Sequence, residues 1–363
     1  MKKIICLIDC LDSGGAQRQL IGLAILLKSK GYNVTIVDYS NITFWDSYLL
    51  ENKIPFHHLD AKNMIGKIVK VFLFIVKFNP DVVIAYLDNP CSIASVVKLV
   101  LHGKFKLIVS DRNTDLNITR HVKNKFFFYR FADWIVPNSF SQGNIIKDYN
   151  KKLISKMQVI TNFVDTKVFV PNYETSLKTF KAKKRFLVVG RIASQKNALG
   201  LLKGLSVLAL KRTDFVVDWF GRPNPEAYYK LCLNYISENP VLKNIIAFHD
   251  HIKNVKDEYT RGTALLLPSY YEGFPNVICE AMSCGLPVLC SNVCDNGYLI
   301  KHGVNGLLFD PYDEFDICDK LNIFLDYDDD KIVEMAKKNR RFAEEYLSES
   351  VFIDKYIDLI GEK

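Results

Sequence analysis

The chain has 363 residues, of which 49% are hydrophobic and 24% charged, with only 18 glycines and 12 prolines. This composition excludes a largely disordered, collagen-like or low-complexity protein, and the length suffices for two or three domains that each bury a core. Residues 1–170 hold 23 Lys and Arg against 13 Asp and Glu, a net charge of +10, whereas residues 171–363 hold 25 against 27. A basic first half indicates that one part of the protein meets an anionic surface.

No stretch is apolar enough to predict a transmembrane helix or a signal peptide. The best candidate, residues 64–78, is interrupted by three lysines, and the first apolar run, residues 4–8, ends at Asp9. The nine cysteines lie scattered in apolar stretches, which is typical of reduced thiols in a cytoplasmic protein.

Short apolar runs alternate with longer helical segments along the whole chain. The runs of the first half are 4–8, 34–37, 82–84, 107–109, 134–136 and 159–160. Those of the second half are 186–189, 216–220, 245–248, 264–267, 287–289 and 307–309. Continuous apolar runs predict strands that are buried on both faces, as in a parallel sheet. The sequence therefore predicts an α/β protein with two doubly wound domains.

A polar, charged stretch near residues 170–184 is the expected linker between these domains. We expect domains at 1–172 and 173–345, followed by a C-terminal helical segment, 346–363, that packs back toward the N-terminal domain. Open α/β sheets bind ligands beyond the carboxyl ends of their strands, so the natural site is a cleft where the two domains face each other.

A glycine turn, Ser13-Gly14-Gly15, follows the first predicted strand and opens the first helix. Glycines there let the backbone approach a ligand, and the helix start offers N–H groups to phosphate oxygens. The turn lacks the full dinucleotide-binding pattern, which disfavours a nicotinamide cofactor. A purely structural glycine turn is equally compatible with this pattern.

Two cations follow the first strand of the second half, in the segment from Gly190 and Arg191 to Lys196. An arginine fork and a lysine point charge at the carboxyl end of a strand suit a diphosphate. The alternative is a solvated basic loop.

The segment from Glu272 to Glu280, with Phe274, Pro275 and Asn276 between them, carries the strongest signal. Glu272 lies in the turn after an apolar strand, and Glu280 lies about two turns into the helix that starts near Asn276. The residues from Phe274 onward would direct backbone N–H groups at an anion, and two carboxylates suit hydroxyl-rich ligands such as a sugar and a ribose. An ordinary surface position of Glu280 is the alternative.

Together, these motifs resemble the signature of GT4-family retaining glycosyltransferases, whose GT-B fold has two Rossmann-like domains facing across a cleft. The block from Glu272 to Glu280, with Glu-Gly-Phe-Pro at its start, is the most specific part of the resemblance. Gly221-Arg222-Pro223 and the segment 303–308 extend it, and it covers essentially the whole chain in order.

The resemblance implies a glycosyltransferase with an acceptor-binding N-terminal domain and a nucleotide-sugar-binding C-terminal domain. It implies that Arg191 and Lys196 neutralise the leaving nucleoside diphosphate and that Glu280 binds the ribose. Glu272 would contact donor-sugar hydroxyls near the anomeric carbon. Further implied donor contacts come from the following residues: Gly14, Gly15, Gly190, Phe274, Pro275 and Asn276. Residues 248–255 resemble the base-binding loop.

In chemical terms, glycosyl transfer breaks an anomeric C–O bond through an oxocarbenium-like state while charge grows on the diphosphate. Cations and N–H groups directed at that charge are expected to supply the largest catalytic effect. The resemblance implies retention of configuration with neither a metal ion nor a cofactor, the nucleotide sugar being a substrate.

Two segments depart from the family pattern. Many members carry a first-domain histidine where this chain has Ser110-Asp111-Arg112-Asn113, so Asp111 is a candidate catalytic residue that orients the acceptor, or else a cap of the following segment. The loop 295–300 lacks the family's Pro-Glu pair.

Cysteines and histidines give no strong metal signal. Cys279, Cys284, Cys290 and Cys294 lack a CxxC pair and sit in apolar surroundings, so we expect buried thiols. For the pairs His57-His58 and His249 with His251, metal binding is the minority interpretation. His249 and His251 line the base loop or are simply solvated.

Two segments, 64–78 and 123–131, mix lysines with apolar side chains, which suits either an anionic headgroup layer or packing on the sheet. With the basic first half, this favours peripheral association with an anionic membrane surface, and the absence of a nucleic-acid-binding motif disfavours a nucleic-acid partner. The family resemblance implies that this surface is the cytoplasmic face of a bacterial inner membrane.

The resemblance then implies a function in surface-polysaccharide synthesis, such as O-antigen, lipopolysaccharide or capsule. The donor is a nucleotide-diphosphate hexose or N-acetylhexosamine, with UDP favoured, and the acceptor is a polyprenyl-diphosphate-linked glycan. A nucleotide-sugar epimerase and a non-catalytic subunit that supports a partner transferase are the alternatives.

Overall fold

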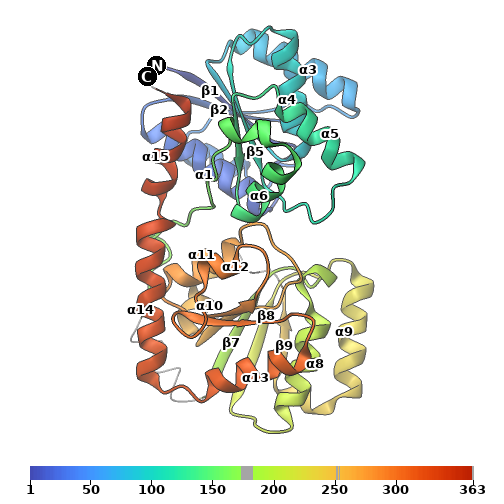
Figure 1. Ribbon diagram of the computed structural model, residues 1–363, viewed down its shortest axis with the longest axis vertical. Helices are drawn as coiled ribbons and strands as arrows, with labels where there is room; N and C mark the ends of the chain where they lie inside the picture. The colour runs from blue at the N-terminus through green and yellow to red at the C-terminus, as the bar shows by residue number, and fades with distance from the viewer. Residues whose placement is uncertain (173–182, 251, 253, 362–363) are drawn as a thin grey trace. The chain divides into compact units, whose positions relative to one another are not determined.

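The computed structural model describes residues 1–172, 183–250, 252 and 254–361, and the chain divides into two compact units. One unit consists of Met1–Asn162 and Glu349–Lys363, and the other of Phe163–Ser348. The division therefore falls at 162/163 and not at the 172/173 boundary that the polar linker indicated. Residues 173–182 of that linker lie outside the described residues. Each unit contains its own sheet (Figure 1).

The first unit is built on a six-stranded parallel sheet with the order β3-β2-β1-β4-β5-β6. Its strands are β1 (Lys3–Leu7), β2 (Asn33–Asp38), β3 (Phe56–His58), β4 (Val82–Tyr86), β5 (Lys106–Asp111) and β6 (Trp134–Pro137). The apolar runs predicted all of these except β3, whose three residues are only partly buried and include two histidines. The strand predicted at residues 159–160 is wrong. Gln158 and Ile160 each donate a backbone hydrogen bond to β6, but the segment forms no strand.

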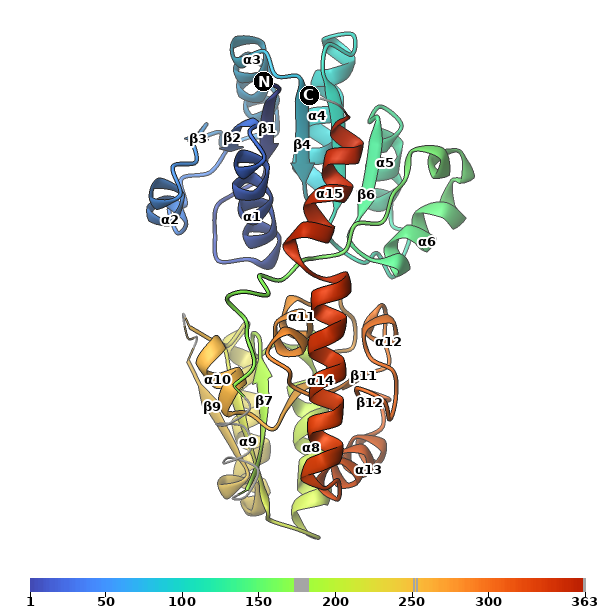
Figure 2. The same ribbon diagram turned by 90° about the vertical axis from the view of Figure 1, so that its left-hand side faces the viewer.

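Helices cover both faces of this sheet (Figures 1 and 2). They are α1 (Gly15–Ser29), α2 (Asp46–Glu51), α3 (Met64–Phe78), α4 (Asp88–Val100), α5 (Arg120–Tyr129), α6 (Phe140–Tyr149), the 3-10 helix η1 (Lys151–Lys156) and α15 (Glu349–Ile360). The C-terminal helix α15 belongs to this unit: the hydroxyls of Tyr86 and Tyr356 lie 2.8 Å apart, and Lys106 Nζ donates to the Ile360 carbonyl at 3.1 Å.

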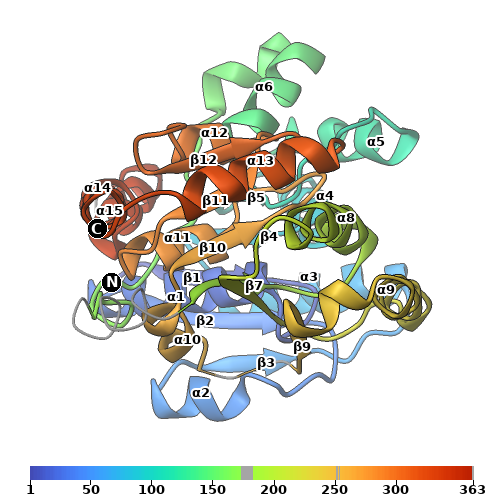
Figure 3. The same cartoon turned by 90° about the horizontal axis from the view of Figure 1, so that it is seen from below.

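The second unit has a parallel sheet with the order β12-β11-β10-β7-β8-β9 (Figure 3). Its strands are β7 (Lys184–Val189), β8 (Phe215–Phe220), β9 (Ile246–His249), β10 (Ala264–Leu267), β11 (Val288–Ser291) and β12 (Gly306–Phe309). All six coincide with predicted apolar runs. The central strands β10 and β11 are buried at every position, as a sheet covered on both faces requires.

The helices of the second unit lie on the two faces of its sheet (Figure 3). They are η2 (Ser194–Lys196), α8 (Ala198–Ala209), α9 (Glu226–Glu238), η3 (Pro240–Asn244), α10 (Lys256–Arg261), α11 (Asn276–Ser283), α12 (Asn296–Leu299), α13 (Glu314–Leu325) and α14 (Asp329–Tyr346). The predicted α/β class with two doubly wound domains is confirmed. Because every strand of this unit is parallel, the loops after β7, β8, β10, β11 and β12 all leave from one edge of the sheet.

Candidate functional site

Lys196 and Glu272 form an ion pair at the carboxyl edge of the second sheet. Lys196 Nζ lies 2.5 Å from Glu272 Oε1, and the two side chains are only 16% and 9% exposed. Lys196 ends the turn η2 after β7, whereas Glu272 lies in the loop between β10 and α11. These strands are neighbours in the sheet, so the fold brings together two residues that are 76 positions apart.

Two hydrogen bonds join the loops that carry this pair. Tyr270 N donates to the Gln195 carbonyl at 2.9 Å, and Gln195 Nε2 donates to the Tyr271 carbonyl at 3.0 Å. The residues that directly precede Lys196 and Glu272 are thus tied to each other. The two charged side chains are held in place by their backbones as well as by their mutual attraction.

Two glycines allow the loops after β7 and β8 to approach closely. A Cβ on Gly221 would lie 1.9 Å from the Gly190 carbonyl oxygen, a distance that no side chain tolerates. Gly190 itself has a φ of +153°, and its carbonyl accepts a hydrogen bond from Trp219 Nε1 at 2.8 Å. The glycines that the sequence singled out here are required by close backbone packing beside Lys196.

Arg191 follows Gly190 and is exposed. Within the described part of the chain, its guanidinium makes no hydrogen bond or ion pair with another residue. Lys196 is therefore neutralised internally by Glu272, whereas the charge of Arg191 is available to an anionic ligand.

Glu280 is buried in α11, at 4% exposure, and is not a surface residue. Its Oε2 accepts a hydrogen bond from the Tyr259 hydroxyl of α10 at 3.1 Å. Tyr259 was not predicted from the sequence, because nothing in its local pattern distinguishes it from a core tyrosine. A buried carboxylate with a fixed orientation can accept hydrogen bonds from ligand hydroxyls at low entropic cost.

The turn before α11 presents its backbone and buries its apolar side chains. Phe274 is 4% exposed and packs in the core with Ile278, and Pro275 is also buried. Pro275 precedes α11 and makes no side-chain capping hydrogen bond, and its carbonyl accepts from the Ile278 N–H group at 3.2 Å.

His249 ends β9, at the carboxyl edge of the same sheet. Its Nε2 lies 2.6 Å from Asp218 Oδ1, and its ring stacks on that of Phe220 at a centroid distance of 4.7 Å. His249 is thus held by defined partners. In the predicted base loop, residues 251 and 253 lie outside the described residues.

No group of three or more His, Cys, Asp or Glu side chains in the described ranges is arranged to hold a metal ion. Three of the four suspected cysteines, Cys279, Cys284 and Cys290, are buried, and burial raises the pKa of Cys284 to about 12. Cys294 is partly exposed and adjoins the ion pair. Burial raises the pKa of its thiol, and the charge of Glu272 adds to this effect.

The remaining predicted residues belong to the first unit. Gly14 is the N-cap of α1, which begins at Gly15, and a Cβ on Gly14 would lie 2.1 Å from Gln17 Oε1. Asp111 ends β5 and is fully buried.

The Asp111 carboxylate is enclosed in a charged network. Lys125 Nζ lies 3.1 Å from Asp111, 3.3 Å from Asp88 and 2.5 Å from Asp115, and Gln142 Nε2 donates to Asp111 at 3.0 Å. Burial raises the pKa of Asp111 although Lys125 opposes the shift. Because its oxygens are occupied inside the unit, this geometry favours a structural role for Asp111 over contact with a substrate.

At Lys125, the structure favours the second of the two interpretations of segment 123–131, internal packing over contact with a headgroup layer. Its side chain is 1% exposed, and Phe126 and Tyr129 are buried beside it. Burial alone would lower the pKa of Lys125, but the charges of Asp111, Asp88 and Asp115 raise it. The Lys125 ammonium is therefore internal and is not available to a membrane surface.

Comparisons with known proteins identify relatives in sequence and in fold. The sequence model described as Glycosyl transferases group 1 matches residues 170–345. A Campylobacter jejuni protein, GalNAc-alpha-(1->4)-GalNAc-alpha-(1->3)-diNAcBac-PP-undecaprenol alpha-1,4-N-acetyl-D-galactosaminyltransferase, is 26% identical, covering 90% of this chain and 89% of its own. The Escherichia coli UDP-Gal:alpha-D-GlcNAc-diphosphoundecaprenol alpha-1,3-galactosyltransferase is 29% identical over 51% of this chain and 49% of its own.

Among solved structures, the chain is similar in fold to Anabaena Alr3699/HepE in complex with UDP. The TM-score is 0.86 with 18% sequence identity, and the match covers 98% of each chain.

Proposed function

We propose that the chain transfers a hexose or N-acetylhexosamine, with retention, from a nucleotide-diphosphate sugar to a polyprenyl-diphosphate-linked glycan, since the model described as Glycosyl transferases group 1 matches residues 170–345. The observation that carries this proposal is the pairing of Lys196 with Glu272, next to an Arg191 that has no partner among the described residues. This arrangement suits a leaving diphosphate next to a hydroxyl-rich sugar.

In the proposed reaction, the anomeric C–O bond breaks and its electron pair leaves with the diphosphate. Arg191 and Lys196 stabilise the charge that develops there, and the backbone N–H groups at the start of α11 add to this effect. The acceptor hydroxyl forms the new bond to the anomeric carbon on the same face, and its proton passes to the departing diphosphate. No side-chain base is required in this route.

The two carboxylates have separate tasks in the proposal. Glu280, oriented by Tyr259 at 3.1 Å, accepts hydrogen bonds from the ribose hydroxyls of the donor. Glu272 accepts from the donor sugar and holds Lys196 in place at 2.5 Å. Both of these carboxylates and both cations belong to the second unit.

The names of similar proteins support the classes of substrate. Two relatives are named for undecaprenol-linked or diphosphoundecaprenol-linked acceptors, one of them with UDP-galactose as donor, and the similar fold binds UDP. We therefore favour a UDP-sugar donor and a function in surface-polysaccharide synthesis.

A lipid-linked acceptor also requires access to a membrane surface. The described helices contain none that is long and apolar enough to span a bilayer. Helix α3, however, exposes Ile65, Val69, Leu73 and Val76 along one side, at 76%, 48%, 58% and 51% exposure. Their spacing places them in a single stripe, and exposed lysines adjoin it at Lys62 and Lys77. We propose that this α3 stripe rests on the anionic cytoplasmic face of the inner membrane.

A donor screen tests the proposed function. The purified chain is incubated with UDP-, GDP- and ADP-sugars, and its melting temperature is measured with each, since a ligand selective for the folded state raises it. The preferred donor is then supplied with a synthetic polyprenyl-diphosphate-linked saccharide, and transfer is followed by mass spectrometry. Stabilisation by a UDP-sugar together with transfer supports the proposal. Release of an altered free sugar in the absence of acceptor would instead indicate an epimerase.

A further inference from the structure

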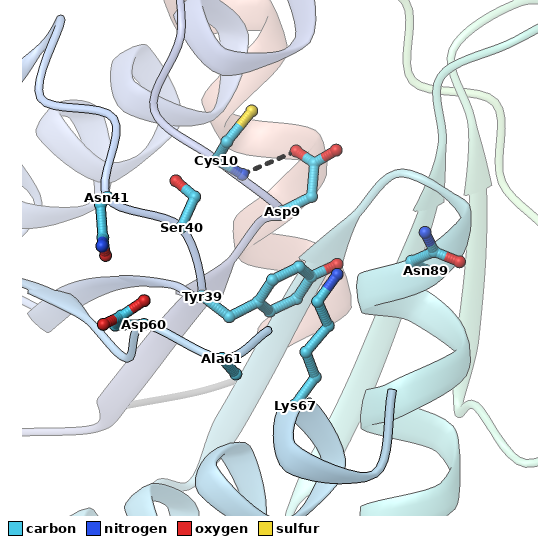
Figure 4. Close-up of a pocket in the computed structure, with 9 residues that line it drawn as sticks. All are labelled: Asp9, Cys10, Tyr39, Ser40, Asn41, Asp60, Ala61, Lys67 and Asn89. Carbon is cyan, nitrogen blue, oxygen red and sulfur yellow. Dashed lines mark hydrogen bonds between the residues drawn. The ribbon is translucent and has the colours of Figure 1, made fainter. Parts of the chain in front are cut away.

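Charged side chains lie near the carboxyl ends of strands in both units, but they differ in how far water reaches them. In the first unit, a cavity of about 370 Å³ lies beside Tyr39 (Figure 4). The Asp60 carboxylate that lines it is exposed, and water screens an exposed charge. In the second unit, Lys196 and Glu272 are only 16% and 9% exposed. A charge in this shielded place acts strongly on a neighbouring ligand ion.

Lys196 and Glu272 have no other charged partner in the part of the chain that the structure describes. A Cβ on Gly190 would lie 3.4 Å from Lys196 Cε, so the lysine side chain passes over the end of β7 at van der Waals distance. Only Oε1 of Glu272 is bonded to the lysine, and Oε2 accepts no hydrogen bond within the same described ranges. The site therefore offers a ligand an ammonium group and a free carboxylate oxygen side by side.

The negative charge of Glu272 acts beyond this ion pair. Cys290 lies in β11, and Cys294 lies in the loop that follows it. Burial raises the pKa of both thiols, and the charge of Glu272 adds to the effect at each. The ammonium of Lys196 therefore does not cancel the field of the carboxylate. An anion bound here is attracted by one group and repelled by the other.

A diphosphate bound by Lys196 lies close to Glu272. Lys196 Nζ is 2.5 Å from Glu272 Oε1. A phosphate oxygen that accepts a hydrogen bond from Nζ lies about 3 Å from it, and hence no more than about 5.5 Å from the carboxylate oxygen. Like charges at this separation repel each other strongly in a shielded site.

The donor and the product of the proposed reaction differ in charge at this position. In the donor, the terminal phosphate is esterified to the sugar and carries a single negative charge. Transfer breaks the bond to the sugar and frees this phosphate, whose second pKa of about 6 gives it nearly two negative charges at neutral pH. Glu272 accepts hydrogen bonds from the hydroxyls of the donor sugar, but it faces the additional charge of the product without them.

We propose that Glu272 discriminates the intact nucleotide sugar from the product nucleoside diphosphate and thereby promotes release of the product. This inference rests on the proposed function, because it takes the donor to be a nucleotide sugar. Lys196 limits the repulsion, so the diphosphate still binds, while the carboxylate lowers its affinity once the sugar has been transferred.

Calorimetric titrations without acceptor test the inference. The probes are UDP, GDP and ADP and the hexose and N-acetylhexosamine conjugates of each, titrated into the full chain at about pH 8, where the free terminal phosphate is fully ionised. For the nucleotide that the wild type prefers, Glu272→Gln should tighten binding of the free diphosphate about threefold to tenfold. The sugar conjugate should bind equally or more weakly, because the loss of charge-assisted hydrogen bonds offsets the relief of repulsion.

Three further variants separate charge from shape. Glu280→Gln is the matched control: its carboxylate is assigned to the ribose, which both ligands contain, so both should weaken by the same factor. Glu272→Asp keeps the charge and should bind the free diphosphate within about twofold of the wild type. Lys196→Met combined with Glu272→Gln leaves neither charge of the shielded pair alone, which protects the fold. This double variant should bind the free diphosphate more tightly than Lys196→Met.

The possible results distinguish this inference from the proposed function. Weaker or unchanged binding of the free diphosphate by Glu272→Gln would overturn the inference, since Glu272 would then only hold Lys196 in place. Equal tightening of the diphosphate and its conjugate, or tightening by Glu272→Asp, would overturn it as well. If no probe binds the wild type, both proposals fail. Selective tightening of the free diphosphate in a protein that transfers no sugar would contradict the proposed function alone.

Discussion

Lys196 Nζ and Glu272 Oε1 lie 2.5 Å apart in the second unit, although 76 positions separate the two residues in the chain. The pair is shielded, and its loops are fastened by the hydrogen bonds between Gln195 and residues 270–271. A shielded ammonium ion stabilises the charge that develops on a diphosphate more strongly than a solvated one. The reason is that no water has to reorganise around it during the reaction.

We predict that Lys196→Ala lowers kcat/KM for sugar transfer by about 100- to 1,000-fold, the effect of losing one preorganised electrostatic contact. Steady-state kinetics with the preferred donor measures this loss. Lys203→Ala is the matched control, because this exposed lysine lies seven positions further along, in α8. Wild-type activity of Lys196→Ala, or an equal loss in Lys203→Ala, would contradict the assigned role.

We predict that Tyr259→Phe raises the KM for the donor about threefold to tenfold, since it removes one hydrogen bond to Glu280. Glu280→Gln should raise the donor KM further, because it removes the negative charge of the carboxylate that accepts the hydrogen bonds of the ribose hydroxyls. If Tyr259 were only a packing residue, Tyr259→Phe would lower the melting temperature without changing the donor KM. Measuring both quantities distinguishes these outcomes.

Lys125→Met is expected to lower the free energy of unfolding by about 3 to 5 kcal/mol, because it leaves the carboxylates of Asp111, Asp88 and Asp115 without their buried cation. Urea denaturation monitored by circular dichroism provides the measurement. The control is Lys123→Met, which changes an exposed lysine two positions away and should alter the stability by less than about 0.5 kcal/mol. Similar stabilities of the two variants would show that the network is not structural.

The stability of the first unit should depend on the charge of His58. Its Nδ1 lies 2.6 Å from Asp38 and its Nε2 lies 3.3 Å from Asp46. Burial alone would lower the pKa of His58, but the two carboxylates raise it above 6.5. The stabilisation is therefore complete below about pH 6.5 and is lost as the pH rises through the higher folded-state pKa.

The difference in unfolding free energy between the wild type and His58→Gln should accordingly shrink from about pH 6 to about pH 9. The titration begins near pH 6 because burial raises the pKa of Asp38, which adds its own dependence at lower pH. His121→Gln, at a histidine whose side chain is 66% exposed, should show almost no such change. A pH-independent difference for His58→Gln would rule out the charged pairing.

We predict that Ile65→Ser combined with Leu73→Ser weakens binding to anionic vesicles of phosphatidylglycerol and phosphatidylcholine by about tenfold or more. Sedimentation with vesicles, repeated at increasing salt, measures this affinity. Leu231→Ser is the control, because Leu231 is 54% exposed on α9 of the other unit. Unchanged vesicle binding by the double variant would exclude the α3 stripe as the membrane contact.

The site could be predicted from the sequence only where its residues lie close together in the chain. The turn from Glu272 to Asn276 and the start of α11 follow from local pattern, since a strand, a turn and a helix succeed one another there. The pairing of Glu272 with Lys196 does not follow, because it depends on β7 lying next to β10 in the sheet. Tyr259 gave no signal for the same reason.

Asp111 and Lys125 were singled out from the sequence, but their surroundings could not be predicted from it. Their local pattern left Asp111 as either a catalytic residue or a cap, and Lys125 as either a membrane contact or a packed residue, and packing made both internal. Local sequence shows where charge is present but not which charges neutralise one another.

By itself, the sequence determined the alternation of strands and helices, the parallel character of both sheets and the segments that leave their carboxyl edges. It could do so because burial on both faces demands continuous apolar runs that are visible locally. Only the tertiary structure decided which side chains meet: the pair of Lys196 with Glu272, the enclosure of Asp111, and the cavity beside Tyr39. Such contacts depend on strand order and on packing between distant segments. Neither of these can be predicted from the spacing of residues that are close together in the chain.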